Sequence, residues 1–103
     1  MTYEVSVTDT ALKDLEDIHA YIAFELGSPA IASEQVRRIK EKVLSLSGLP
    51  RRYPRFRREL WQGSDLRRMV VDRFVVFYEV DDAAQTVFVN SILYGPSDLE
   101  SRL

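Results

Sequence analysis

The chain of 103 residues contains no cysteine and a single histidine, His19. Without cysteine there is no disulfide scaffold, no cysteine-ligated zinc site and no thiol nucleophile. A serine–histidine–aspartate triad could be built only on His19, which lies beside the apolar stripe of a predicted helix, where a surface role is common. We therefore predict neither a metal nor another cofactor.

Long apolar runs are also missing, since none approaches the roughly 18 residues that a membrane span needs. The opening MTYEVSVTD has neither the basic region nor the apolar region of a signal peptide. A cytoplasmic protein without a membrane partner is the expectation. The length fits one domain over residues 1–103, with no internal repeat or linker, and the 46% of hydrophobic residues exclude a disordered chain.

Positive charge is scarce outside one segment. Residues 51–73 hold eight positive and three negative side chains, a local charge of +5. The rest of the chain carries a charge of −7, which gives the net charge of −2. All eight bases are arginines: Arg51, Arg52, Arg55, Arg57, Arg58, Arg67, Arg68 and Arg73. Arginine binds phosphate and carboxylate in a bidentate manner. This arginine block predicts a binding surface for an anionic partner, and the alternative is a solvated face of salt bridges.

Hydrophobic periodicity predicts the elements of the first half. Residues 3–7 alternate as a strand, and two stripes with three- and four-residue steps predict helices that end near Gly27 and Gly48. Ser28 and Pro29 are expected at the start of the second helix as N-cap and first residue. A link this short makes the two helices an antiparallel hairpin.

The second half begins with an irregular stretch, residues 49–65, in which aromatic residues alternate with arginines. Strands are predicted over 66–71, 74–80 and 86–94, with a tight turn at Asp72 and Arg73. The order β-α-α-β-β-β predicts an α+β domain: an N-terminal strand and a helical hairpin packed on one face of a small antiparallel sheet.

Several motifs together resemble the RelE/ParE superfamily of bacterial toxins. They are an opening Y-x-V, then T-D-T-A-L-K-D-L-E-D-I-x-x-Y-I, and later L-R-R-M-V-V, F-V-V-F-Y-E-V-D and V-F-V-N-S-I-L-Y-G-x-x-D-L, spread over Tyr3 to Leu99. The resemblance implies a RelE/ParE-like fold and the growth-inhibiting toxin of a type II toxin–antitoxin module, silenced by a cognate antitoxin protein. RelE-like members cleave mRNA on the ribosome without a metal, and ParE-like members inhibit DNA gyrase.

The resemblance also implies site residues. The basic positions of the second strand are matched by Arg67 and Arg68, which point to opposite faces of a strand. We predict Arg67 as the phosphate ligand, because Leu66 and Val70 share the other face with Arg68. Tyr94 as proton donor and Asp98 as base or orienting group complete the predicted catalytic set, although Tyr94 could pack on the core and Asp98 could cap the tail. The predicted target- or nucleic-acid-binding residues are Arg55, Arg57, Arg58, Arg68, Arg73 and Trp61.

The sequence also departs from the superfamily. The positions of its third- and fourth-strand arginines fall near Val75 and Gly95, and the ending Y-G-R-R-D becomes Tyr94-Gly95-Pro96-Ser97-Asp98. Three functions stay open: a ribosome-dependent mRNA endonuclease, a gyrase inhibitor without catalysis, and a degenerate toxin that only binds its antitoxin. The predicted partners are the antitoxin and either the ribosome with mRNA or DNA gyrase, in a homodimer or a toxin–antitoxin hetero-oligomer.

Overall fold

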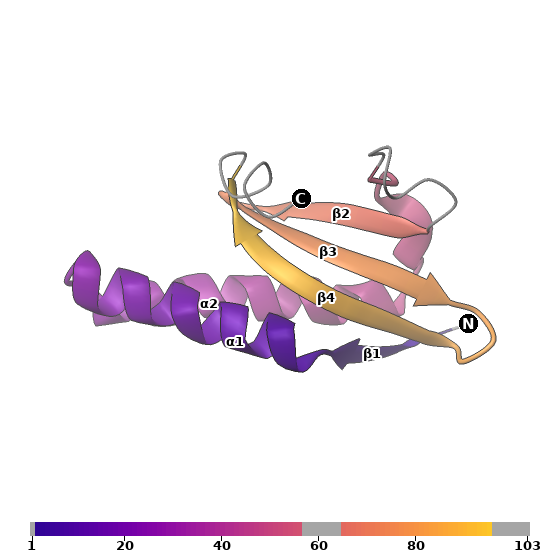
Figure 1. Cartoon of the computed structure of the whole chain (residues 1–103), viewed down its shortest axis with the longest axis horizontal. Coiled ribbons are helices and arrows are strands. Elements are labelled where there is room, and N and C mark those ends of the chain that lie inside the picture. The colour runs from indigo at the N-terminus through magenta and orange to yellow at the C-terminus, as the bar shows by residue number, and fades with distance from the viewer. Residues whose placement is uncertain (1, 57–64, 96–103) are drawn as a thin grey trace.

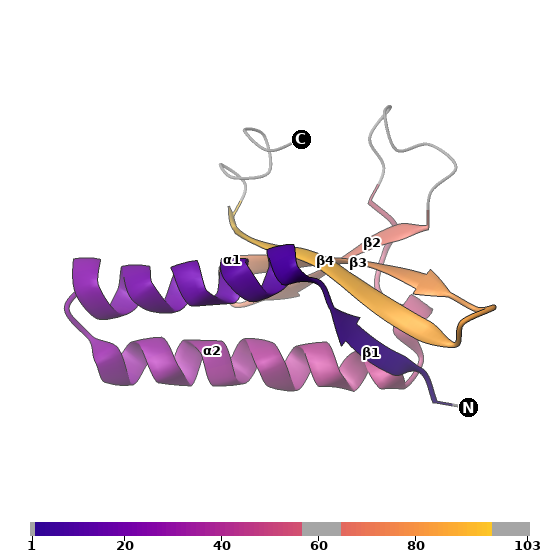
Figure 2. The same ribbon diagram turned by 60° about the horizontal axis from the view of Figure 1, so that its bottom comes forward.

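Two antiparallel helices cover one face of a sheet in the computed structural model, which describes residues 2–56 and 65–95 (Figures 1 and 2). The elements are β1 (Glu4–Val7), α1 (Asp9–Ala20), the π-helical turn η1 (Tyr21–Glu25), α2 (Pro29–Leu44), the 3₁₀ turns η2 (Ser45–Ser47) and η3 (Pro50–Arg52), β2 (Leu66–Val71), β3 (Phe74–Asp81) and β4 (Thr86–Tyr94). The predicted α+β class and element order are confirmed.

The described strands lie in the order β1-β4-β3-β2. β2 with β3 and β3 with β4 pair antiparallel, whereas β1 pairs parallel with β4, from Glu4 opposite Thr86 to Val7 opposite Val89. The sheet is therefore mixed, and not antiparallel throughout as predicted. The chain enters the helical hairpin directly from β1 and returns to β4 only at its end, so no local pattern reports the direction of this pairing.

Two cap positions and one glycine turn set the boundaries of the helices. Thr8 caps α1, because its hydroxyl accepts a hydrogen bond from the amide of Ala11 at 3.2 Å. Gly27 turns the chain with φ at +67°, a conformation that suits glycine. Ser28 occupies the cap position of α2 without a side-chain hydrogen bond, and only its carbonyl accepts from the amide of Ala32.

The main core lies between the helices and the sheet. It includes Leu15, Ile18, Ile22, Ile39, Val43 and Leu46 from the helical segment and Met69, Val76, Tyr78, Val87, Val89 and Ile92 from the strands. A smaller cluster on the other face joins Leu66, Val75, Phe77 and Leu93, and the ring of Phe56 packs edge-on against Phe77 at 5.1 Å. β3 is thus buried on both faces, as its continuous apolar run predicts.

Tyr78 carries a hydroxyl group into the main core. Its side chain is fully buried in β3, and its hydroxyl donates a hydrogen bond to the carbonyl of Pro50 at 2.5 Å. Burial raises the pKa of Tyr78 to about 12. The contact ties the segment after α2 to the centre of the sheet.

High pH should destabilise the protein through Tyr78. An unfolded tyrosine ionises near pH 10 and the folded one only near 12, so stability is intact below about pH 10 and is lost as the pH rises towards 12. We expect the free energy of unfolding to fall by about 1 kcal/mol through this group between pH 9 and 11. Denaturant unfolding of wild type and Tyr78→Phe at both pH values checks it: the variant should lose less, and equal losses would contradict the assignment.

Candidate functional site

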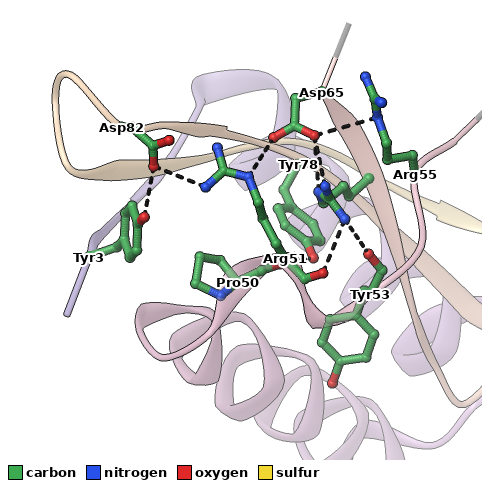
Figure 3. A network of polar contacts seen from close by, with 9 residues as sticks. Tyr3, Pro50, Arg51, Tyr53, Arg55, Asp65, Tyr78 and Asp82 are labelled. Carbon is green, nitrogen blue, oxygen red and sulfur yellow. Dashed lines mark hydrogen bonds and ion pairs between the residues drawn. The ribbon is translucent and has the colours of Figure 1, made fainter. Parts of the chain in front are cut away.

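Arginines of the block converge on Asp65, just before β2 (Figure 3). The carboxylate of Asp65 lies 3.0 Å from Nη2 of Arg67, 3.1 Å from Nε of Arg51 and 3.6 Å from Nε of Arg55. Three positive charges thus share one carboxylate. We call these four residues the Asp65 cluster.

Arg51 extends the Asp65 cluster to a second carboxylate (Figure 3). Its Nη1 lies 3.0 Å from Asp82, which also accepts a hydrogen bond from the hydroxyl of Tyr3 at 2.7 Å. The bonds from Arg51 and Tyr3 hold the pKa of Asp82 below its usual range. These contacts join the N-terminal segment, η3 and the β3–β4 turn, so they stabilise the fold as well as place charge.

Arg67 is almost enclosed, with only 13% of its side chain exposed. Besides Asp65, its Nη1 donates hydrogen bonds to the carbonyls of Arg51 at 3.1 Å and Tyr53 at 2.8 Å. It shares the helix-facing side of β2 with Met69. The prediction that the face of Leu66 and Arg68 is turned towards the helices is therefore wrong. Leu66 belongs to the smaller apolar cluster on the other face of the sheet.

The other arginines of the block differ in their surroundings. Arg52 donates to the carbonyls of Ser45 and Gly48 at the end of the second helical segment, and it lies over the ring of Tyr53 at 4.8 Å. Arg68 on β2 and Arg73 in the β2–β3 turn are exposed, and neither forms an ion pair within residues 2–56 and 65–95. The predicted site residues Arg57, Arg58, Trp61 and Asp98 lie outside the described residues.

The described arginines therefore form two sets. Arg51, Arg52, Arg55 and Arg67 are engaged in intramolecular contacts, and Arg68 and Arg73 present open guanidinium groups. A single continuous cationic face, as the charge count predicted, is not what the described segment presents. Among the arginines of the block that the structure describes, Arg68 and Arg73 are the two exposed ones whose side chains form neither an ion pair nor a hydrogen bond within the described residues, and they lie on neighbouring parts of one hairpin.

A cavity of about 680 Å³ lies beside this hairpin, between α1, η1, the β2–β3 turn and the end of β4. Apolar side chains form much of its lining: Ile18, Tyr21, Ile22, Leu26, Phe74, Ile92, Leu93 and Tyr94. Its polar groups are Asp14, Asp17, Gln35, Arg38, Asp72 and Arg73. We call it the helix-side cavity. It is large enough for several side chains of a partner or for a small ligand.

Asp72 fixes one wall of the helix-side cavity. It accepts a hydrogen bond from Nε2 of Gln35 at 2.8 Å and pairs with Arg38 at 2.9 Å, so the β2–β3 turn is held against α2. These contacts, first that of Gln35 and then that of Arg38, hold the pKa of Asp72 below its usual range. φ at Asp72 is +57°, which this tight turn requires.

Asp14 fixes the opposite wall. Its carboxylate is buried and accepts a hydrogen bond from the amide of Ile92 at 2.9 Å, just where β1 has ended and no longer pairs with β4. A carboxylate of α1 thus accepts the hydrogen bond that a neighbouring strand would otherwise accept from β4. Asp14 is a position of the candidate site that was not predicted from the sequence, although its place three residues after Ala11 and four before Ile18 puts it on the apolar stripe of the helix.

Of the predicted catalytic residues, Arg67 and Tyr94 lie within the described part of the chain, and the fold does not bring these two together. Arg67 pairs across the sheet with Tyr78, whereas Tyr94 pairs with Phe74, whose ring it meets edge-on at 5.5 Å. Phe74 and Tyr78 are four positions apart in β3, which is about 13 Å along the strand. Tyr94 lines the helix-side cavity and Arg67 lies in the Asp65 cluster. Their predicted catalytic roles stay predictions.

The described residues contain no group of three acidic, histidine or cysteine side chains that could hold a metal ion. In the same part of the chain, no helix is long and apolar enough to cross a bilayer.

The chain matches the family model of the ParE toxin of the type II toxin–antitoxin system parDE over residues 5–98. Among solved structures, it resembles a chain of the chromosomal ParDE toxin–antitoxin system of P. aeruginosa, with a TM-score of 0.75 and 20% identity over 92% of this chain and 98% of that one. No curated protein matches it.

RelE-type structures are similar as well. A chain of the RelBE2 toxin–antitoxin complex of Mycobacterium tuberculosis has a TM-score of 0.65 and 24% identity, covering 91% of this chain and 92% of that one. A mutant of the E. coli toxin RelE in the free state has a TM-score of 0.62 and 19% identity, covering 100% and 99%. At these identities the likeness is one of fold.

Proposed function

The chain belongs to the ParE toxin family of type II toxin–antitoxin systems, and from this premise we propose that it arrests growth by binding DNA gyrase, without cutting RNA, and that a cognate antitoxin neutralises it. The family match supports the first part, because gyrase inhibition is the activity that the resemblance to ParE implies. The similar structures from P. aeruginosa and M. tuberculosis are toxin–antitoxin systems, which supports the second.

The placement of Arg67 is the observation that argues against RNA cleavage. Metal-free cleavage needs a base, an acid and a cation that stabilises the pentavalent phosphorane. The guanidinium of Arg67 is held by Asp65 and two carbonyls, and Tyr94 lies about 13 Å further along the sheet. A phosphate would have to displace three existing contacts to bind Arg67.

Binding a protein target makes a different demand. It needs an exposed surface with a few strong anchors, among which arginine is enriched, and no reacting groups. Arg68 and Arg73 are exposed and free of ion pairs in the described segments. Acidic patches of a protein would suit these two arginines.

Induced expression in a host tests the proposal, with plasmid supercoiling and mRNA ends mapped in parallel. We expect arrested growth, relaxed plasmid and unchanged mRNA ends, and inhibited supercoiling when the purified protein is added to purified gyrase. New mRNA ends that appear only with ribosomes, and vanish in a folded Arg67→Ala variant, would support the endonuclease instead. Unchanged growth would leave a degenerate toxin that only binds its antitoxin.

A further inference from the structure

We propose that two exposed leucines at the end of α2, Leu44 and Leu49, anchor the chain on DNA gyrase, with Lys40 and Arg52 set against an acidic part of that protein's surface. We call these four residues the Leu49 patch. The inference rests on the proposed function, because it takes gyrase to be the target, and it names the surface of this chain that the target contacts.

The backbone of Leu49 has a conformation that leucine avoids. Its φ and ψ are 49° and 56°, in the left-handed region. Two rules disfavour this: the Cβ atom comes too close to the following carbonyl oxygen, and a residue before a proline, here Pro50, is pushed towards extended backbone. The preceding Gly48 is extended, with φ at −114°, so the glycine stands one position before the place that suits it.

No contact inside the described chain explains a leucine at this position, because 78% of Leu49 is exposed. In the described segments, the other non-glycine residues with positive φ are Asp72 and Gln85. Both are polar and bonded: Asp72 accepts from Gln35, and Gln85 donates to the carbonyl of Asp82 at 2.8 Å. A strained residue whose side chain does nothing for its own fold points to a role in function, and for an exposed leucine that role is contact with a partner.

The two leucines belong to backbone segments that one guanidinium holds together. Nη1 of Arg52 donates to the carbonyl of Ser45, next to Leu44, at 3.5 Å and to the carbonyl of Leu49 at 3.2 Å, and it also bonds the carbonyl of Gly48. Leu44 is itself 65% exposed. The strained turn is thus fixed before a partner arrives, and a pre-organised anchor loses little conformational entropy on binding.

Charge around the leucines favours an acidic partner. Lys40 is exposed and lies one helical turn before Leu44, on the same face of α2. Lys40 and Arg52 form no ion pair within residues 2–56 and 65–95, whereas the nearby Glu41 is paired with Arg37. Apolar groups beside unpaired cations fit a surface that offers apolar residues next to carboxylates.

Other occupants fit less well. A symmetric dimer through the Leu49 patch would bring the cations of one copy against those of the other, which is unfavourable. The patch is also separate from the helix-side cavity. Figure 2 shows the end of α2 beside β1, at the opposite end of the helical hairpin from its tip, and none of the four patch residues lines that cavity.

Leu49→Asn tests the anchor, because asparagine tolerates left-handed backbone but offers no apolar contact. We expect two effects of opposite direction. The melting temperature should rise by about 2 °C or more, and the protein concentration that half-inhibits supercoiling by purified gyrase should rise about 10-fold or more. Leu49→Met keeps an apolar side chain and should inhibit within about twofold of wild type.

Phe24→Asn is the control for the loss of an exposed apolar group. Phe24 is 82% exposed and lies in η1, at the other end of the helical hairpin. Its replacement should leave gyrase inhibition within about twofold of wild type. Equal losses in Phe24→Asn and Leu49→Asn, or a melting temperature that falls in Leu49→Asn, would overturn the assignment of Leu49 as an anchor.

Lys40→Glu and Lys42→Glu test the charge in the same helix. Both lysines are exposed, but Lys42 lies two residues before Leu44 and so on another side of α2. Lys40→Glu should weaken the affinity for purified gyrase about fivefold or more, with a smaller effect at high salt, and Lys42→Glu should stay within about twofold. Equal effects of the two changes would overturn the acidic complement.

The outcomes separate this inference from the proposed function. Wild-type protein without effect on gyrase would refute the proposed function and the inference with it. Wild-type inhibition that Leu49→Asn and Lys40→Glu both retain would refute the Leu49 patch alone. Antitoxin affinity, or self-association in sedimentation, that is lost in Leu49→Asn while gyrase inhibition is retained would assign the patch to that other occupant and overturn the proposal.

Discussion

Replacing Ile39 with alanine should lower the free energy of unfolding by about 2–5 kcal/mol. Ile39 is fully buried in α2, within the core between the helices and the sheet. Truncation removes buried apolar area and leaves a cavity that the packed neighbours fill only in part. For a domain of this size the melting temperature should fall by roughly 10 °C or more. Urea unfolding at neutral pH, followed by circular dichroism, measures the change.

The matched control is Ile31→Ala, the same substitution in the first part of the same helix. Ile31 is 62% exposed, so its truncation should change the free energy of unfolding by less than about 0.5 kcal/mol. Because both changes alter helix propensity equally, their difference isolates the burial of Ile39. Similar costs at the two positions would mean that α2 does not pack on the sheet through the stripe that contains Ile39.

The sequence was sufficient to predict the helices and the hairpins because their signals are local. The stripe of α2 places Ala32, Ile39 and Val43 on one face, and all three are buried. The turn at Asp72 and Arg73 joins β2 and β3 as predicted, with Val71 opposite Phe74. Each of these features depends on residues a few positions apart, which is the range over which periodicity and turn chemistry act.

The pairing of β1 lies beyond that range. Val5 stands opposite Val87, more than 80 positions later in the chain, and the two strands run parallel. The alternation around Val5 shows that one face is apolar, but it carries no information about the neighbouring strand or its direction. The buried carboxylate of Asp14 is a consequence of this pairing, since it serves the part of β4 that the short β1 leaves uncovered.

The candidate site was predicted least well because charge counts ignore which charges meet. The block at residues 51–73 carries +5, yet Asp65 lies between Arg51, Arg55 and Arg67, and Arg51 also reaches Asp82 in a distant turn. Only folding brings these groups together. Sequence spacing could place Arg67 and Arg68 on opposite faces of β2. It could not show which face is turned towards the helices, because the second cluster around Leu66 makes both faces of the strand partly apolar.

Removing the carboxylate of Asp65 should expose how far Arg67 depends on it. We expect Asp65→Ala to lower the free energy of unfolding by about 1–3 kcal/mol, because the enclosed guanidinium of Arg67 loses its partner and keeps only two carbonyls. Asp17→Ala, at an exposed pair with Lys13, is the control and should cost less than about 0.5 kcal/mol. Urea unfolding at neutral pH and moderate salt measures both.

A double-mutant cycle with Arg67→Met then assigns the cost. If Asp65 acts mainly through Arg67, its removal should cost about 1 kcal/mol less in the Arg67→Met background, where no enclosed charge is left without a partner. Equal costs in both backgrounds would mean that Asp65 stabilises the fold through Arg51 and Arg55 instead. The guanidinium of Arg67 would then be energetically free to exchange its carboxylate for a phosphate, and the case for a protein-binding toxin without RNA cleavage would lose the observation that carries it.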